Sequence, residues 1–114
     1  MEIREDRAGG ILVVAPVGRI DSNTSEALEK AVLGCLARGE TQLVMDLQGV
    51  EYISSAGLRV LLVAANKLRP LGGRLVLCSL CKSVQQVFDL AGLTAVFTIE
   101  ASRELALALL AGSA

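Results

Sequence analysis

The chain lacks histidine and tryptophan, and only three of its 114 residues are aromatic: Tyr52, Phe88 and Phe97. Without histidine, a Ser-His-Asp triad is excluded, and a zinc site would need the three cysteines alone. The glycine-rich, lysine-containing motif that cradles phosphates in many nucleotide-binding proteins is also missing. The sequence therefore excludes several common enzyme classes before any motif is considered.

Clustered positive charge is missing as well. The chain carries 11 lysines and arginines against 12 aspartates and glutamates, which gives a net charge of −1. Nucleic-acid binding needs clustered cations for the phosphates, and single strands also use aromatic side chains on which bases stack. We therefore expect no nucleic-acid partner.

Long apolar runs are absent too, since none approaches the roughly 20 residues that cross a bilayer. The first ten residues are rich in charge and do not resemble a secretory signal. We therefore expect a cytoplasmic protein without membrane insertion. At 114 residues and 53% hydrophobic composition, the chain can bury one aliphatic core without a disulfide or a metal. We expect a single domain over residues 1–114 and no cofactor.

Apolar periodicity predicts alternating strands and helices. A glycine pair at 9–10 favours an opening hairpin, in which residues 2–7 pair with Ile11–Val17. Strands that are joined through helices pair in parallel, so we expect an α/β domain with a mixed sheet. After a loop over Gly18–Thr24, the expected elements are a helix that ends at Gly39, a strand over Gln42–Leu47, a helix from about Ser55 to Arg69, a strand over Arg74–Cys78, a helix closed by Gly92, a strand over Val96–Ile99 and a helix over Ser102–Ala111.

The start of the second of these helices is the most informative point in the sequence. Ser54 has the side chain of a helix N-cap, which makes Ser55 the first helical residue. A helix N-terminus has unpaired N–H groups and a partial positive charge, so a phosphate on Ser55 would be stabilised there. Ala56 and Gly57 are too small to obstruct it. Taken alone, paired serines before an apolar helix are usually only caps.

The run Tyr52-Ile53-Ser54-Ser55-Ala56-Gly57-Leu58, followed by Arg59-Val60-Leu61-Leu62, resembles the signature of the STAS domain. Within that family it is most similar to the stand-alone bacterial anti-sigma-factor antagonists. The resemblance covers nearly the whole chain, because three further blocks follow the family's order and spacing. These blocks are Gly18-Arg19-Ile20-Asp21, Gly72-Gly73-Arg74-Leu75-Val76-Leu77 and Val87-Phe88-Asp89-Leu90-Ala91-Gly92-Leu93.

The resemblance implies a single STAS domain, with a small mixed, mostly parallel sheet, an N-terminal hairpin and about four helices packed mainly on one face. It also implies a partner switch in transcription regulation. The unphosphorylated protein would bind an anti-sigma factor that has the histidine-kinase ATPase fold and acts as a serine kinase, and would so release a sigma factor. Phosphorylation would abolish binding, and a PP2C-like phosphatase would reverse it. On this reading the domain is a substrate and not an enzyme.

The family's phosphorylated serine aligns with Ser55. Two neighbours depart from the family's Asp-Ser-Ser/Thr-Gly motif: Ser54 replaces the aspartate, and Ala56 replaces the second hydroxyl residue. The resemblance places Asp21 beside the phosphorylated serine, although Asp21 could equally cap the first helix. Asp46 is expected to bond backbone N–H groups of the loop that leads to Ser54. Gly57 completes the set that supports the phosphorylation site.

The second helix also offers a candidate partner surface. Leu58, Leu61, Leu62, Ala65 and Leu68 form one apolar stripe, which seats the helix on the sheet. Val60, Val63 and Ala64 lie off that stripe, so either neighbouring helices cover them or they form part of a patch for a partner. In the second reading, the partner-binding residues are Ser54, Ser55, Ala56, Arg59, Val60 and Val63.

Two other functions stay open. Cys78-Ser79-Leu80-Cys81 is a Cys-x-x-Cys pair at a strand-to-helix junction, where a helix N-terminus lowers the pKa of a thiol, as in thiol oxidoreductases. Small buried cysteines are nevertheless common, and Cys78 falls inside an apolar strand pattern. Alternatively, the STAS domain could serve as a scaffold in a lipid-transport or signalling complex without sigma control.

Overall fold

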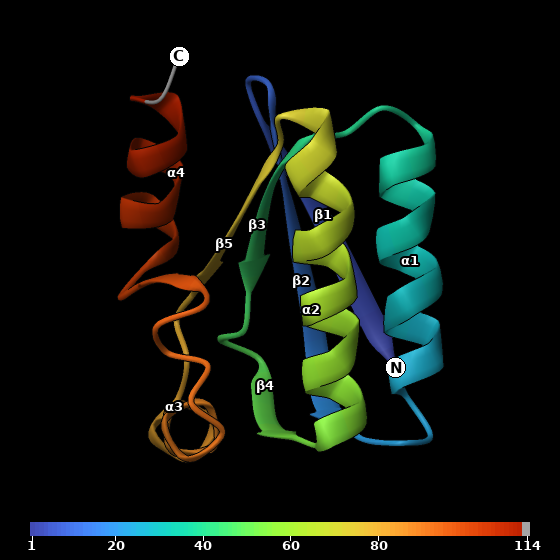
Figure 1. Cartoon of the computed structure of the whole chain (residues 1–114), viewed down its shortest axis with the longest axis vertical. Coiled ribbons are helices and arrows are strands. Elements are labelled where there is room, and N and C mark those ends of the chain that lie inside the picture. The colour runs from blue at the N-terminus through green and yellow to red at the C-terminus, as the bar shows by residue number, and fades with distance from the viewer. Residues whose placement is uncertain (113–114) are drawn as a thin grey trace.

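A computed structural model describes residues 1–112, so the last two residues of the domain expected over 1–114 lie outside the described part. Within that part, six strands and four α-helices form one α/β unit (Figure 1). The strands are β1 (Glu2–Ala8), β2 (Ile11–Ile20), β3 (Gln42–Asp46), β4 (Val50–Ile53), β5 (Arg74–Cys78) and β6 (Thr98–Glu100). The helices are α1 (Ser25–Ala37), α2 (Ser55–Leu68), α3 (Lys82–Leu90) and α4 (Arg103–Ala111), with a short 3₁₀ turn over Arg69–Leu71.

The strand order is β1-β2-β3-β5-β6, and β4 pairs with β2 outside this path. β1 and β2 form the antiparallel hairpin, whereas β2–β3, β3–β5, β5–β6 and β2–β4 are parallel. The predicted mixed, mostly parallel sheet with an opening hairpin is confirmed.

The sheet separates two apolar clusters, because successive side chains of a strand point to opposite faces. Along β3, Leu43 and Met45 join the larger cluster with α1, α2 and α3, while Val44 joins Val76 and Cys78 in a smaller cluster under α4. Figure 1 shows α1 and α2 side by side over the sheet and α4 on its own. The helices therefore pack mainly on one face, as expected, and α4 is the exception.

β4 is missing from the predicted elements, because Gln48–Glu51 is mostly polar and such a segment is typical of a break between elements. Only Gln48 and Gly49 form that break, and Val50 and Ile53 then turn inward while Glu51 and Tyr52 stay exposed. β2 is also longer than predicted and continues to Ile20, because its first part pairs with β3 and its last part with β4. The register shifts between Gly18 and Arg19, where Gly18 has a φ of 112°.

The last strand also differs from its predicted range. Leu93–Phe97 folds into turns, in which the carbonyl of Leu93 accepts hydrogen bonds from the N–H groups of Val96 and Phe97. Because of these turns, β6 begins at Thr98 and not at Val96. The ring of Phe97 meets that of Phe88 edge to face, with centroids 5.7 Å apart, and this contact holds the turns against α3.

Gly57 seats the start of α2 on the sheet. A Cβ atom at this position would lie 2.6 Å from Ile20 Cγ2 and 2.8 Å from Ile53 Cγ1, both in side chains that are fully buried. Only a glycine lets the first turn of α2 approach β2 and β4 so closely. Gly57 is therefore required for packing, and its lack of a side chain also leaves space beside Ser55 at the helix start.

Gly57→Ala is expected to destabilise the fold by about 1–2 kcal/mol, because overpacking outweighs the gain in helix propensity. The matched control is Gly34→Ala in α1, where the nearest atom to an added Cβ is 3.9 Å away. That control should stabilise by about 0.5–1 kcal/mol. Urea unfolding of both variants checks this, and a Gly57→Ala variant as stable as the control would contradict the packing role.

Candidate functional site

The helix start at Ser54 is confirmed. Ser54 is the N-cap of α2: its Oγ accepts a hydrogen bond from the Gly57 N–H at 3.3 Å, and its carbonyl accepts one from the Leu58 N–H at 2.9 Å. The residue is half-buried. Its hydroxyl is thus engaged in holding the first turn, as expected of a cap.

Ser55, the first helical residue, is exposed, and no acceptor or donor within residues 1–112 bonds its hydroxyl. The cap satisfies the amides of Gly57 and Leu58. The amides of Ser55 and Ala56 find no acceptor in the described part of the chain, as is usual for a first turn. An anion carried by Ser55 would therefore meet unpaired N–H groups and the positive end of the helix dipole.

Asp21 lies beside this helix start, although 33 positions separate it from Ser54 in the sequence. The Ser54 N–H donates to the Ile20 carbonyl at 2.8 Å, and Ile20 is paired with Ile53 in the β2–β4 ladder. The loop that begins at Asp21 is thus attached directly to the loop that carries the serines. The structure brings together the two segments that the resemblance places side by side.

The Asp21 carboxylate also has a local role. Its Oδ1 accepts hydrogen bonds from the N–H groups of Asn23 at 2.9 Å and Thr24 at 3.1 Å. The bond from Asn23 is the largest cause that lowers the pKa of Asp21, against an opposing effect of burial. The Asp21 carbonyl accepts from the Ser25 N–H at 2.8 Å. Asp21 therefore builds the turn that leads into α1 and stays ionised at neutral pH.

Arg19 and Tyr52 complete the cluster and were not predicted as site residues. They are register partners in the β2–β4 pair, and the Arg19 guanidinium lies 4.2 Å from the centre of the Tyr52 ring. Arg19 is also 4.0 Å from the Asp21 carboxylate. The sequence could not show this contact, because it depends on a strand, β4, that the sequence did not reveal.

The predicted partner surface on α2 needs one correction. Val60 is only 3% exposed and Ala64 is fully buried, because α1 packs along that side of α2. A neighbouring helix covers them, which was the alternative left open, so Val60 cannot contact a partner. Val63 and Ala56 are half-buried, and Arg59 is exposed.

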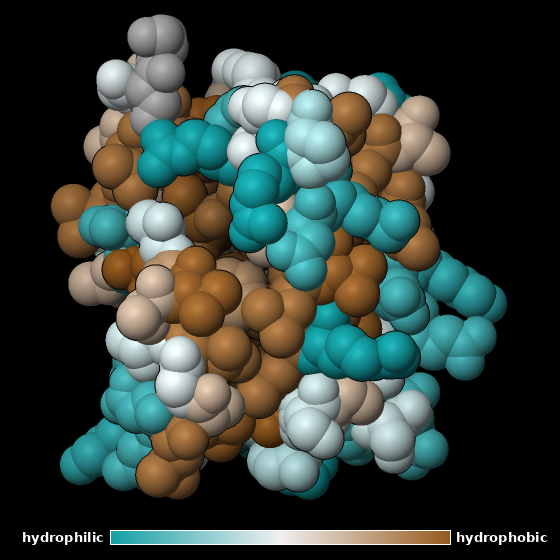
Figure 2. Space-filling view, viewed as in Figure 1, coloured by the Kyte–Doolittle hydropathy of each residue, from teal (hydrophilic) through white to brown (hydrophobic). Residues whose placement is uncertain are grey.

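The apolar surface closest to Ser55 lies on the other flank of α2. Leu62 stands seven positions after Ser55, which places it on the same side of the helix, whereas Leu58, three positions after Ser55, is buried in the core. Leu62 and Ala65 pack against the core but remain half-buried. Figure 2 shows apolar surface between the positions of α2 and α3. The apolar pattern alone predicts that this whole stripe lies in the core. The partial exposure of its edge depends on how closely the neighbouring elements pack against α2, and a periodic pattern does not contain that information.

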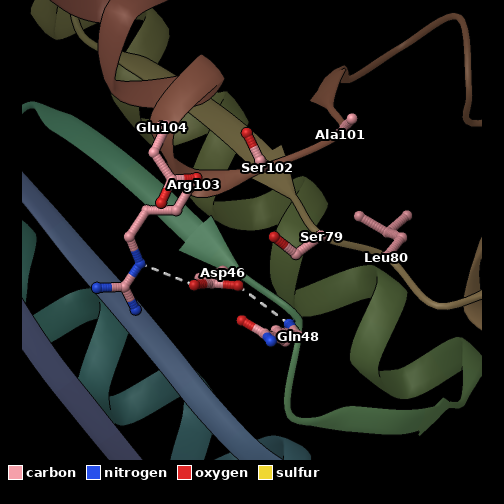
Figure 3. Close-up of a pocket in the computed structure, with 8 residues that line it drawn as sticks. All are labelled: Asp46, Gln48, Ser79, Leu80, Ala101, Ser102, Arg103 and Glu104. Carbon is pink, nitrogen blue, oxygen red and sulfur yellow. Dashed lines mark hydrogen bonds and ion pairs between the residues drawn. The ribbon is translucent and has the colours of Figure 1, made fainter.

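Asp46 is buried and bonds the β3–β4 loop, as predicted, through the Gln48 N–H at 3.0 Å. Its other oxygen accepts from Arg103 Nε at 2.8 Å (Figure 3). Arg103 also pairs with Asp6. These contacts lie on the α4 side of the sheet, because the Asp46 side chain follows Val44 in the strand alternation. Asp46 therefore anchors α4 and the loop backbone and does not belong to the Ser55 cluster.

The two cysteines of the Cys-x-x-Cys pair lie in different environments. Cys78 is buried in the cluster under α4, and burial raises the pKa of its thiol to about 11. Cys81 precedes α3, packs against the larger cluster, and has its pKa lowered mainly by a hydrogen bond with the Ser83 hydroxyl. A dithiol redox site needs two sulfurs that face each other. The geometry therefore does not favour the oxidoreductase reading.

Residues 1–112 offer neither a metal centre nor a membrane-spanning helix. No group of three or more cysteine, aspartate or glutamate side chains there could hold a metal ion. No helix in the same part of the chain is both long and apolar enough to cross a membrane.

The chain belongs to the STAS domain family, whose model matches residues 2–106. BtrV of Bordetella bronchiseptica, named as an anti-sigma factor antagonist, is 40% identical over 108 residues, which cover 95% of this chain and 93% of BtrV. The crystal structure of an anti-sigma factor antagonist from Mycobacterium paratuberculosis matches with a TM-score of 0.87 and 29% identity, covering 95% of this chain and 92% of that one.

The anti-sigma factor antagonist SpoIIAA has the same fold in two solved forms. The unphosphorylated form matches with a TM-score of 0.75 and 17% identity, covering 97% of this chain and 99% of that chain. The phosphorylated form, from Bacillus, matches with a TM-score of 0.73 and 18% identity, covering 96% of this chain and 99% of that chain. The family-model match and the 40% identity to BtrV confirm the family predicted from the Tyr52–Leu58 run and the three further blocks.

Cys81 is expected to be the most reactive of the three thiols. The lowered pKa of Cys81 gives it more thiolate than an ordinary cysteine at a given pH, whereas burial raises the pKa of both Cys35 and Cys78. A disulfide reagent at pH 7.5 should label Cys81 in the folded protein and Cys78 only after unfolding. Cys81→Ala should remove the rapid phase. Formation of a Cys78–Cys81 disulfide under mild oxidation of the folded protein would instead support the redox reading.

Proposed function

We propose that this protein is an anti-sigma-factor antagonist whose binding is switched by phosphorylation of Ser55. The observation that carries the proposal is the pair of serines at the start of α2, where Ser54 is engaged as the cap and Ser55 is exposed. The exposed second hydroxyl is therefore the better target for a kinase, since the first is half-buried and engaged as the cap. Membership of the STAS family and the names of the relatives supply the partner class.

The proposed docking surface is centred on Ser55. Ala56 and Arg59 continue it along the exposed face of α2, with Val63 at one edge. Leu62, which is half-buried, replaces the buried Val60 as its apolar flank. The partner is an anti-sigma factor with the histidine-kinase ATPase fold that also acts as the serine kinase, and docking of the unphosphorylated protein releases a sigma factor.

Phosphorylation adds about −1.5 to −2 charges at Ser55. The helix N-terminus stabilises this charge, so the fold need not change. The occurrence of the SpoIIAA fold in both phosphorylated and unphosphorylated forms supports this point. Docking is lost because a phosphate buried against a surface shaped for a neutral hydroxyl must give up its hydration, at a cost of several kcal/mol.

In this proposal the domain is a substrate and not a catalyst. ATP and the catalytic metal belong to the kinase, and a PP2C-like phosphatase restores the serine. Asp21 and Ser54 hold the helix start in place from two sides, through the turn into α1 and through the cap. A scaffold role in a complex without sigma control is the alternative, and it predicts no effect of charge at Ser55 on the capture of an anti-sigma factor.

The switch is tested with Ser55→Ala and Ser55→Asp, titrated calorimetrically against the anti-sigma factor that the unmodified protein captures. Ser55→Ala should bind like the wild type, because its side chain is small and neutral. Ser55→Asp should stay equally stable, since a carboxylate is favourable at a helix N-terminus, yet bind at least about tenfold more weakly.

Ser54→Ala is the matched control. It removes the cap and should lower stability by about 0.5–2 kcal/mol while leaving the affinity of the folded protein nearly unchanged. If both Ser55 variants bound like the wild type, Ser55 would be only the residue that follows a cap, and the switch mechanism would be wrong.

A further inference from the structure

We propose that Arg59 is the residue of this chain that pairs with the phosphate on Ser55, so that phosphorylation removes a cation from the docking surface as well as adding negative charge. This inference rests on the proposed phosphorylation of Ser55. It concerns the consequence of the modification inside the chain and not the identity of the kinase or of the partner.

The spacing of the two residues carries the inference. Ser55 and Arg59 are four positions apart in α2, and both are exposed. Residues at this spacing lie on one helix face, with their Cβ atoms roughly 5–6 Å apart. Helical side chains lean toward the N-terminus, so a side chain as long as that of Arg59 can reach Ser55. An acid four positions before a base is also the more favourable order for such a pair.

Arg59 is available for this role. None of the ion pairs found among residues 1–112 includes it, whereas Arg4, Arg7, Arg38 and Arg103 all have acidic partners. A guanidinium also matches the geometry of a phosphate, because it can donate two parallel hydrogen bonds.

The other charged groups around the helix start are less suited. The Arg19 guanidinium lies over the Tyr52 ring and is 4.0 Å from the Asp21 carboxylate. The negative charge of Asp21 therefore already balances the positive charge of Arg19. Asp21, in the loop attached to this helix start, is acidic and opposes a phosphate. Because the phosphate adds its charge to that of the Asp21 carboxylate, a cation on the helix face of Ser55 is the group that offsets the repulsion.

The pairing changes the surface at two positions. In the unmodified protein the Arg59 guanidinium is free to meet an acidic group on a partner. In the phosphorylated protein it is held by the phosphate one helical turn away. A single modification thereby alters both the centre of the docking surface and the cation beside it.

The test uses the full chain with phosphoserine incorporated at position 55 during synthesis, so that it needs neither the kinase nor the partner. The second pKa of the phosphate is measured by ³¹P NMR titration in the wild type, Arg59→Met and Arg59→Lys. Loss of the cation should raise this pKa by about 0.2–0.4 pH units, the size expected for one pair at this spacing. Arg59→Lys should retain most of the effect.

Arg69→Met is the matched control, because Arg69 follows the end of α2, is exposed, and lies roughly 20 Å along the helix axis from Ser55. It should leave the phosphate pKa unchanged. An unchanged pKa in Arg59→Met, or an equal rise in Arg69→Met, would overturn the proposal. A failure of the kinase or of partner binding would instead count against the proposed function and would leave this titration intact.

Discussion

The site depends on one interaction, the parallel pairing of the end of β2 with β4. This pairing ends at the hydrogen bond from the Ser54 N–H to the Ile20 carbonyl, and Gly57 then packs the first turn of α2 against Ile20 and Ile53. Because these contacts are buried, the direction in which α2 leaves the sheet is fixed. The positions of Ser55, Asp21 and the Arg19–Tyr52 pair all follow from this junction.

The junction joins a rigid interior to an exposed surface over very few residues. Ile53 and Gly57 are buried, Ser54 is engaged as the cap, and Ser55 and Arg59 face outward. A chemical change at Ser55 therefore alters the charge of the surface without disturbing the packing beneath it. The proposed switch requires this separation, because it must change the binding surface and keep one fold.

The sequence predicted those features that depend on local chemistry. The Ser54 cap, the start of α2 and the opening hairpin follow from short-range preferences, and the structure bears them out. The features that it missed depend on long-range contacts. β4 is a strand because it can pair with β2, Val60 is buried because α1 covers it, and Asp46 turns toward α4 because the alternation along β3 directs it there. No local pattern contains this information.

The most direct measurement compares the wild-type protein with and without a phosphate mapped by mass spectrometry to Ser55. Amide NMR spectra and chemical unfolding report the fold, and calorimetry against the anti-sigma factor reports binding. We expect spectral changes confined to the end of β2, β4 and the first turns of α2, a stability within about 1 kcal/mol of the unmodified protein, and an affinity reduced at least about tenfold. Unchanged affinity, or a loss of affinity that accompanies general unfolding, would contradict a switch that acts through the surface alone.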